Sequence, residues 1–138
     1  MKAEVKQISG LSMIGKANSN HWTVMDGLKI FKGAEAGTRP MELVLIALGG
    51  CTGMDVISLL GKRHAPLQNL ELRLEAEQAK EHPRVFTDIH IKYIFRGKGL
   101  KNEDIKWAIE ASQNKYCPAT AMLGETAEIS YSWEIVEA

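Results

Sequence analysis

The sequence predicts an α+β fold in which antiparallel sheets surround one long central helix. An almost wholly apolar run, residues 43–60, predicts a helix that is apolar on every side, and such a helix is either buried in protein or lies in a membrane. Segments that alternate apolar and polar residues flank this run, as in strands with one face in water. Because strands and helices come in groups instead of alternating, the pattern favours α+β over a parallel βαβ arrangement.

Short alternating segments near the N-terminus predict a small meander. Strands are expected over residues 1–8, 11–14 and 21–25, with turns at Gly10, at the Asn-Ser-Asn run of residues 18–20, and at Asp26-Gly27. A loop rich in Gly and Ala, residues 32–37, then leads into the long helix.

The long helix is expected to begin between Thr38 and Pro40 and to end near Lys62, with Gly61 as a possible left-handed residue at that end. Pro40 suits the first turn, and a carboxylate at Glu42 interacts favourably with the helix dipole. A central Asp55 counts against a membrane span, because a charge in lipid is costly. So few strands cannot cover a helix that is apolar all round, and the adjacent glycines at 49–50 permit a second helix to approach. We therefore predict a homodimer with two copies of this helix at its centre, and no membrane association.

The second half of the chain predicts a hairpin, two helices and a final strand. Residues 70–77 and 85–95 alternate and are separated by a polar turn, which is typical of an antiparallel hairpin. Asn102 is expected to cap a helix that continues to about residue 116. Pro118 can start a short second helix ending at Gly124, and residues 129–135 alternate as a half-exposed strand.

Size and charge limit the classes of function. The chain of 138 residues is expected to form one domain, 1–138, and its 17 Lys and Arg balance 17 Asp and Glu, so a basic surface for nucleic acid is not expected. The first ten residues lack the apolar segment of a signal peptide, so we expect a cytoplasmic protein. In that compartment two cysteines suit catalysis, redox cycling, metal binding or core packing better than a structural disulfide.

The two cysteines are the candidate reactive residues. A thiol reacts as the thiolate, and a free thiol with a pKa of about 8.5 is mostly protonated at neutral pH. Cys117 directly precedes Pro118 and is expected at a helix N-cap, where unpaired N–H groups favour a thiolate. Cys51 lies in apolar surroundings and needs a cation, from Arg39, Lys16 or a partner chain. Core packing is the alternative for both thiols, and no CxxC or HxxxH spacing indicates a metal site.

Two stretches around the cysteines carry a family resemblance. They are PMELVLIALGGCTGMDV, residues 40–56, and NKYCPATAML, residues 114–123. Together with the order of the elements along nearly the whole chain, they resemble the OsmC/Ohr family of thiol-dependent peroxidases of organic hydroperoxides, most closely its YhfA-like subgroup. The resemblance implies an OsmC-like fold of two intertwined chains, with active sites at the dimer interface.

By this resemblance Cys51 is the peroxidatic cysteine, and Cys117 resolves its sulfenic acid to a disulfide that an external dithiol reduces. Arg39 would hold the thiolate and polarise the peroxide, and Glu42 would orient the arginine. The family's acidic residue directly follows the proline, where this chain has Met41, so Glu42 is rotated by about 100° and need not face the same way. No cofactor is implied. The alternative function is a non-catalytic dimer that binds an apolar small molecule.

Overall fold

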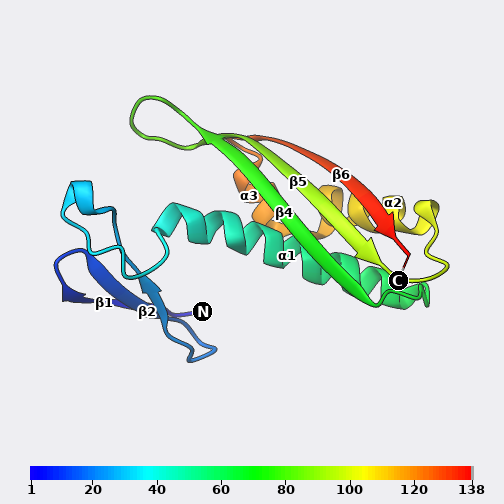
Figure 1. The fold of residues 1–138 in the computed structure, drawn as a ribbon, viewed down its shortest axis with the longest axis horizontal. Coiled ribbons are helices and arrows are strands. Elements are labelled where there is room, and N and C mark those ends of the chain that lie inside the picture. Colours follow the sequence, from blue (N-terminus) through cyan, green and yellow to red (C-terminus); the bar gives the residue numbers. More distant parts are fainter. Residues whose placement is uncertain (138) are drawn as a thin grey trace. The chain divides into compact units, whose positions relative to one another are not determined.

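The protein, seen in a computed structural model that describes residues 1–137, combines strands and helices in the predicted α+β manner (Figure 1). Its contacts divide it into two compact units, Met1–Val44 and Leu45–Ala138. The first unit contains β1 (Glu4–Ser9), β2 (Ser12–Lys16), β3 (Thr23–Met25), the short helix η1 (Lys29–Phe31) and the start of α1 (Pro40–Lys62). The second contains the rest of α1, β4 (Asn69–Gln78), β5 (Phe86–Arg96), α2 (Asn102–Ala111), the π-helical turn η2 (Ser112–Tyr116), α3 (Pro118–Leu123) and β6 (Glu128–Val136). The single domain over 1–138 stays a prediction.

The first unit is a sheet without an apolar core. Its strands pair antiparallel in the order β1–β2–β3, as predicted, and a left-handed Gly10 with φ +57° makes the turn between β1 and β2. Asp26 is the one buried residue of positions 1–44. Apolar side chains such as Val5 and Trp22 remain exposed. A small sheet needs a buried apolar face to be stable on its own, and this one has none.

The loop after β3 is organised around the Asp26 carboxylate. Its Oδ2 accepts hydrogen bonds from Ser12 Oγ at 2.6 Å and from the Ala36 N–H at 3.2 Å. Its Oδ1 accepts from the N–H groups of Gly27 at 2.7 Å and Ala34 at 3.2 Å. The bond from Ser12 is the largest of the causes that lower the pKa of Asp26 from 3.8 to about 2, against the opposing effect of burial.

We expect Asp26 to make stability depend on pH in the acid range. Because the folded pKa is lowered, the carboxylate stabilises the fold above its ordinary pKa of 3.8, and that contribution is lost as the pH falls towards 2. Asp26→Asn should be less stable than the wild type at neutral pH, since an amide nitrogen cannot accept a hydrogen bond. Its stability should also change less between about pH 4 and pH 2. Urea unfolding followed by circular dichroism measures both effects, and equal acid slopes in the two proteins would contradict the assignment.

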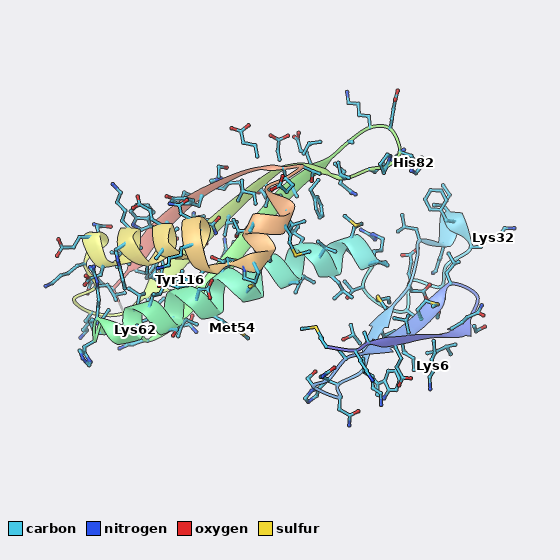
Figure 2. The ribbon with its side chains drawn as sticks, turned by 180° about the vertical axis from the view of Figure 1, so that it is seen from behind. Lys6, Lys32, Met54, Lys62, His82 and Tyr116 are labelled. Carbon is cyan, nitrogen blue, oxygen red and sulfur yellow. The ribbon has the colours of Figure 1, made fainter. Side chains whose placement is uncertain are left out.

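The second sheet has the order β4–β5–β6. β4 and β5 pair antiparallel, as the predicted hairpin. β6 pairs parallel to β5, so the prediction of purely antiparallel sheets is wrong at this edge. Parallel neighbours need a long crossover, and α2, η2 and α3 provide it by returning the chain to the end of the sheet where β5 began. These helices and α1 lie on the same face of the sheet (Figures 1 and 2).

The core of the second unit lies between this sheet and the helices. Its fully buried apolar side chains come from α1, β5 and α2, and include Leu48, Val56, Leu60, Ile91, Phe95, Ile105 and Ile109. Two glycines bring α1 close to β4: a Cβ on Gly49 would lie 2.9 Å from Leu74 Cδ1, and one on Gly53 would lie 3.1 Å from Leu72 Cδ1. Gly49 therefore serves a helix–sheet contact within the chain, whereas the sequence analysis assigned it to a contact between two helices.

Two helix ends differ from the expectation. Asn102 begins α2 but does not cap it; Lys101 is the N-cap, and no side-chain hydrogen bond caps the helix. The Asn102 Oδ1 instead accepts from Trp133 Nε1 of β6 at 3.0 Å, so a contact with the sheet takes the place of capping. At the end of α1 the left-handed residue is His64, with φ +55°, and not Gly61.

α1 has the length and composition of a membrane span, with a mean hydropathy of 2.0 and 39% of the apolar window buried. The core helix of a soluble protein passes the same test, so this is weak evidence for a membrane. Four exposed apolar residues of α1, Ile46, Gly50, Met54 and Ile57, form one stripe, spaced three and four residues apart. A Cβ on Gly50 would meet nothing within 4 Å, and Met54 points away from the sheet (Figure 2). We call these four residues the α1 stripe.

Candidate thiol site

The two cysteines, far apart in the sequence, meet in the second unit. Cys51 lies in the middle of α1 and is partly exposed, while Cys117 is buried. Both are free thiols. The Cys117 side chain and the Ala119 N–H lie close enough to the Cys51 thiol to act on its pKa. The structure thus brings together the cysteine pair that the sequence analysis singled out.

Cys117 is held from both sides. As predicted, it is the N-cap of α3, with Pro118 at the first helical position and Sγ accepting a hydrogen bond from the Thr120 N–H at 3.4 Å. Its own N–H donates to the carbonyl oxygen of Ser112 at 2.8 Å, which closes the η2 turn. Single π-helical turns are frequent at functional sites, and here the η2 turn places Cys117 beside α1.

The surroundings of Cys51 raise the pKa of its thiol above the ordinary value of 9.0. Burial is the largest cause, and the hydrogen bond with Cys117 and the charges of Cys117 and Asp55 act in the same direction. The Ala119 N–H opposes them. Within this unit Cys51 is therefore mostly a thiol at neutral pH, so a reactive thiolate requires a cation, as the sequence analysis inferred.

Arg39 and Glu42 form a pair of their own in the first unit, at the start of α1. Glu42 Oε2 accepts from Arg39 Nη2 at 3.0 Å, and Oε1 accepts from the Arg39 backbone N–H at 2.9 Å. These bonds hold the Arg39 side chain and backbone at the start of α1, because the carboxylate of Glu42, the third helical residue, reaches back to the residue before the helix. Lys16, also in the first unit, lies 3.6 Å from a carboxylate oxygen of Glu4.

A buried polar cluster surrounds the residue that follows Cys51. Thr52 Oγ1 lies 2.7 Å from Tyr93 Oη and 2.8 Å from Ser112 Oγ, and it accepts from Gln113 Nε2 at 3.2 Å. Ser112 Oγ also donates to Asp55 Oδ2 at 3.0 Å, and Gln113 Nε2 also donates to Tyr93 Oη at 3.0 Å. Thr52, Tyr93 and Ser112 are fully buried. We call these five residues the Thr52 cluster.

This cluster is absent from the residues predicted from the sequence, although two signals pointed to it. Asp55 is a carboxylate in an apolar helix and needs a hydrogen-bond partner. Ser112 is a polar residue on the inward stripe of the helix that begins at Asn102. The sequence could not show that these two residues are partners of one another, because they come from different elements.

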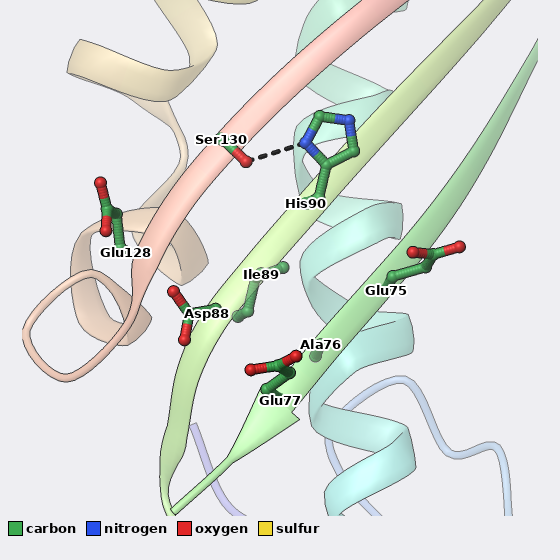
Figure 3. A pocket seen from close by; sticks show the side chains of 8 residues that line it. All are labelled: Glu75, Ala76, Glu77, Asp88, Ile89, His90, Glu128 and Ser130. Atoms are coloured by element: carbon green, nitrogen blue, oxygen red, sulfur yellow. Dashed lines mark hydrogen bonds between the residues drawn. The ribbon is translucent and has the colours of Figure 1, made fainter.

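The opposite face of the same sheet carries an acidic hollow of about 570 Å³ (Figure 3). Its exposed carboxylates are Glu75, Glu77, Asp88 and Glu128, none of which forms an ion pair with a described residue. His90 is engaged on both ring nitrogens, by Ser130 Oγ at 2.8 Å and Ser132 Oγ at 2.9 Å. Exposed carboxylates on an outer sheet face are normally solvated, and no thiol lines the hollow, so the cysteine pair remains the candidate site.

Comparison with known proteins points to one family. The family model described as OsmC-like protein matches residues 32–132. The protein YhfA of Escherichia coli (strain K12) is 37% identical over 138 residues and is covered, like this chain, over 100% of its length. A hypothetical protein from Aquifex aeolicus VF5 has a crystal structure with a TM-score of 0.87 and 27% identity, over 99% of this chain and 96% of that chain. The organic hydroperoxide resistance protein OhrB of Bacillus subtilis shares the fold, with a TM-score of 0.66 at 14% identity over 97% of this chain and 98% of the other.

Proposed function

This chain belongs to the OsmC-like family, and we propose that it reduces organic hydroperoxides, with Cys51 as the peroxidatic and Cys117 as the resolving cysteine. The observation that carries the proposal is that two free thiols, far apart in the sequence, lie close enough in the second unit for Cys117 to act on the pKa of Cys51. Two neighbouring thiols suit a reversible disulfide, whereas two cysteines that merely fill a core need not lie near one another. A protein of similar fold named for organic hydroperoxide resistance supports the choice of substrate class.

The proposed cycle has three steps. The Cys51 thiolate attacks the distal peroxide oxygen, which bears the hydrogen, and the O–O bond breaks. Cys51 becomes a sulfenic acid, and the alkoxide takes a proton and leaves as the alcohol. The Cys117 sulfur then attacks the Cys51 sulfur, an S–S bond forms, and the hydroxyl leaves with the Cys117 proton as water. An external dithiol reduces this disulfide by exchange and is itself oxidised to a disulfide.

A cation is needed to make the first step fast at neutral pH, because the surroundings of Cys51 raise its pKa. We assign this role to Arg39, whose guanidinium is held by Glu42 in a charge-assisted hydrogen bond of 3.0 Å. The arginine would come from the same chain or from its partner. It would stabilise the thiolate and polarise the peroxide, while apolar residues around Cys51 would accept the alkyl group.

The proposed active form is a cytoplasmic homodimer. The α1 stripe leaves apolar side chains of a central helix uncovered, and Gly50 leaves open space for a second backbone. The first unit has no apolar core of its own and needs a covering surface. A second copy of the chain would cover both the α1 stripe and the first unit in a closed, two-fold assembly. The balanced charge gives no reason to expect nucleic acid, and we place the protein away from the membrane because Asp55 interrupts the apolar helix.

A hollow in the first unit supports the alternative function. It measures about 460 Å³ and is lined mostly by apolar residues, namely Val5, Leu11, Met13, Met25 and Pro40, with Asp26 and Gly27. This volume falls in the range of small-molecule pockets, which suits a non-catalytic dimer that binds an apolar ligand. In that case the cysteines would contribute packing alone, and Cys51→Ser would bind the ligand like the wild type.

Thiol titration separates the two functions. We expect one equivalent of cumene hydroperoxide to remove two titratable thiols per chain and lower the mass by two hydrogens. Dithiothreitol or a lipoyl dithiol should restore both thiols. If both thiols stay titratable while the peroxide is untouched, the peroxidase proposal is wrong. An apolar molecule that co-purifies with the wild type and equally with Cys51→Ser, seen by native mass spectrometry, would favour the binding protein.

A further inference from the structure

We propose that the Thr52 cluster positions Cys117 against Cys51, so that Thr52 and Ser112 set how readily the disulfide between the two cysteines forms. The inference deepens the proposed function and rests on it for the catalytic consequence. The thiol geometry on which it is built belongs to the second unit alone. Neither Thr52 nor Ser112 is assigned contact with peroxide or with the exchanging sulfurs, and we therefore call both positioning residues.

Ser112 forms hydrogen bonds both to α1 and to Cys117. Its side-chain hydroxyl lies 2.8 Å from Thr52 Oγ1 and donates to Asp55 Oδ2 at 3.0 Å, both on α1. Its backbone carbonyl accepts from the Cys117 N–H at 2.8 Å. Thr52 directly follows Cys51 in the sequence. A short path of bonds therefore connects the backbones of the two cysteines through Thr52 and Ser112.

The direction of every hydrogen bond in the cluster can be deduced. Ser112 Oγ donates its single hydroxyl proton to Asp55 Oδ2, so Thr52 must donate to Ser112. The Thr52 oxygen then accepts from Tyr93, and it also accepts from Gln113. Burial raises the pKa of Tyr93, which keeps its phenol protonated and able to donate. Each buried hydroxyl thus has one orientation, as in a fully satisfied network that specifies a unique geometry.

Such a network constrains position more narrowly than apolar packing does. A hydrogen bond weakens steeply when its distance or angle departs from the optimum, while apolar contacts have no preferred direction. Two further bonds from Gln113 hold the same turn to α1 and β5. Condensation of two sulfurs requires a near-attack distance of roughly 3–3.5 Å, and a misplacement of about 1 Å can cost on the order of 100-fold in rate. The cluster holds η2, the turn that carries Cys117, so a change in the cluster would displace Cys117 relative to Cys51.

The matched variants are Thr52→Val and Thr52→Ser. Valine keeps the shape of threonine but cannot donate or accept, while serine keeps the hydroxyl. The protein dithiol is equilibrated with oxidised and reduced dithiothreitol, where oxidised dithiothreitol takes two electrons and two protons as the protein S–S bond forms. We expect the equilibrium constant for forming the protein disulfide to fall about 10-fold or more in Thr52→Val, and about 3-fold or less in Thr52→Ser.

Ser112→Ala is the second variant, because Thr52→Val leaves several buried polar groups unpaired and could unfold the protein. It should lower the same equilibrium constant, while Ser132→Ala should not, since it removes a serine hydroxyl bonded to His90 on the outer face of the sheet. Thermal melting of the reduced proteins checks that each variant is folded at the temperature of the assay. In single-turnover experiments with cumene hydroperoxide, Ser112→Ala should form the Cys51 sulfenic acid at the wild-type rate and convert it to disulfide about 10-fold more slowly.

Failure of this inference is distinguishable from failure of the proposed function. If folded Thr52→Val and Ser112→Ala have the equilibrium constant of the wild type and of Ser132→Ala, the positioning role is wrong, whatever the peroxidase activity. If the wild type forms the disulfide with oxidised dithiothreitol but consumes no peroxide, the peroxidase proposal is wrong, and a lowered constant in Thr52→Val still supports the positioning role.

Discussion

Cys51→Ser is expected to abolish peroxide consumption, lowering its rate by at least about 1,000-fold, because the serine hydroxyl does not ionise near neutral pH and cannot replace the thiolate. The substitution removes a single sulfur from the middle of α1. The measurement is the consumption of cumene hydroperoxide with dithiothreitol as the reductant, at equal concentrations of folded protein.

Cys117→Ser is the matched control, since it makes the same substitution at the other cysteine. It should keep the first turnover and accumulate a Cys51 sulfenic acid that dimedone traps, and it should lose sustained turnover. Its loss should be smaller when a small thiol can resolve the sulfenic acid directly. Wild-type peroxide consumption by Cys51→Ser, or an equal loss of the first turnover in both variants, would contradict the assigned roles.

Local signals allowed much of the fold to be predicted. Pro40 and the apolar run after it marked α1, which the structure places at Pro40–Lys62. The dipeptide at Cys117 and Pro118 predicted a helix N-cap, and the structure has Cys117 there. Alternation over two segments predicted the β4–β5 hairpin. In each case the residues that decide the structure are neighbours in the sequence, and the physical cause acts over a few residues.

Features that depend on distant partners could not be predicted in this way. The direction of β6 depends on where the crossover through α2 and α3 ends, so its parallel pairing with β5 was missed. The Thr52 cluster draws its members from α1, β5 and η2, and no single segment contains its pattern. Asn102 was predicted to cap α2, but its side-chain oxygen accepts a hydrogen bond from Trp133 on the last strand.

α1 is apolar on all sides, but its two faces differ in how deeply they are buried within the chain. Leu48, Val56 and Leu60 are fully buried within the chain, while Met54 and Ile57 are exposed at 75% and 51%. A helix with one wet face normally shows a polar stripe there, and the absence of one in α1 means that its second face also avoids water. The sequence pattern is therefore explained better by a surface outside the single chain than by packing inside it.

A charge on the α1 stripe is accordingly expected to break the proposed homodimer. Met54 is 75% exposed in the single chain, so Met54→Lys should cost a monomer little. In a helix-to-helix interface the same ammonium would be buried without a partner, which is strongly destabilising. We expect the dimer dissociation constant to rise at least about 100-fold, on the order of 3 kcal/mol. Sedimentation over a range of protein concentrations measures it.

Met122→Lys is the control, since Met122 on α3 is also 75% exposed and receives the same change in charge. It should leave the dissociation constant near that of the wild type. The melting temperature of the wild type should rise with protein concentration, because a subunit whose first unit has no core gains its stability from association. Met54→Lys should melt at a lower temperature than Met122→Lys. A wild type that stays monomeric at all concentrations, or two lysine variants that dissociate alike, would show that the α1 stripe is covered by something other than a second copy.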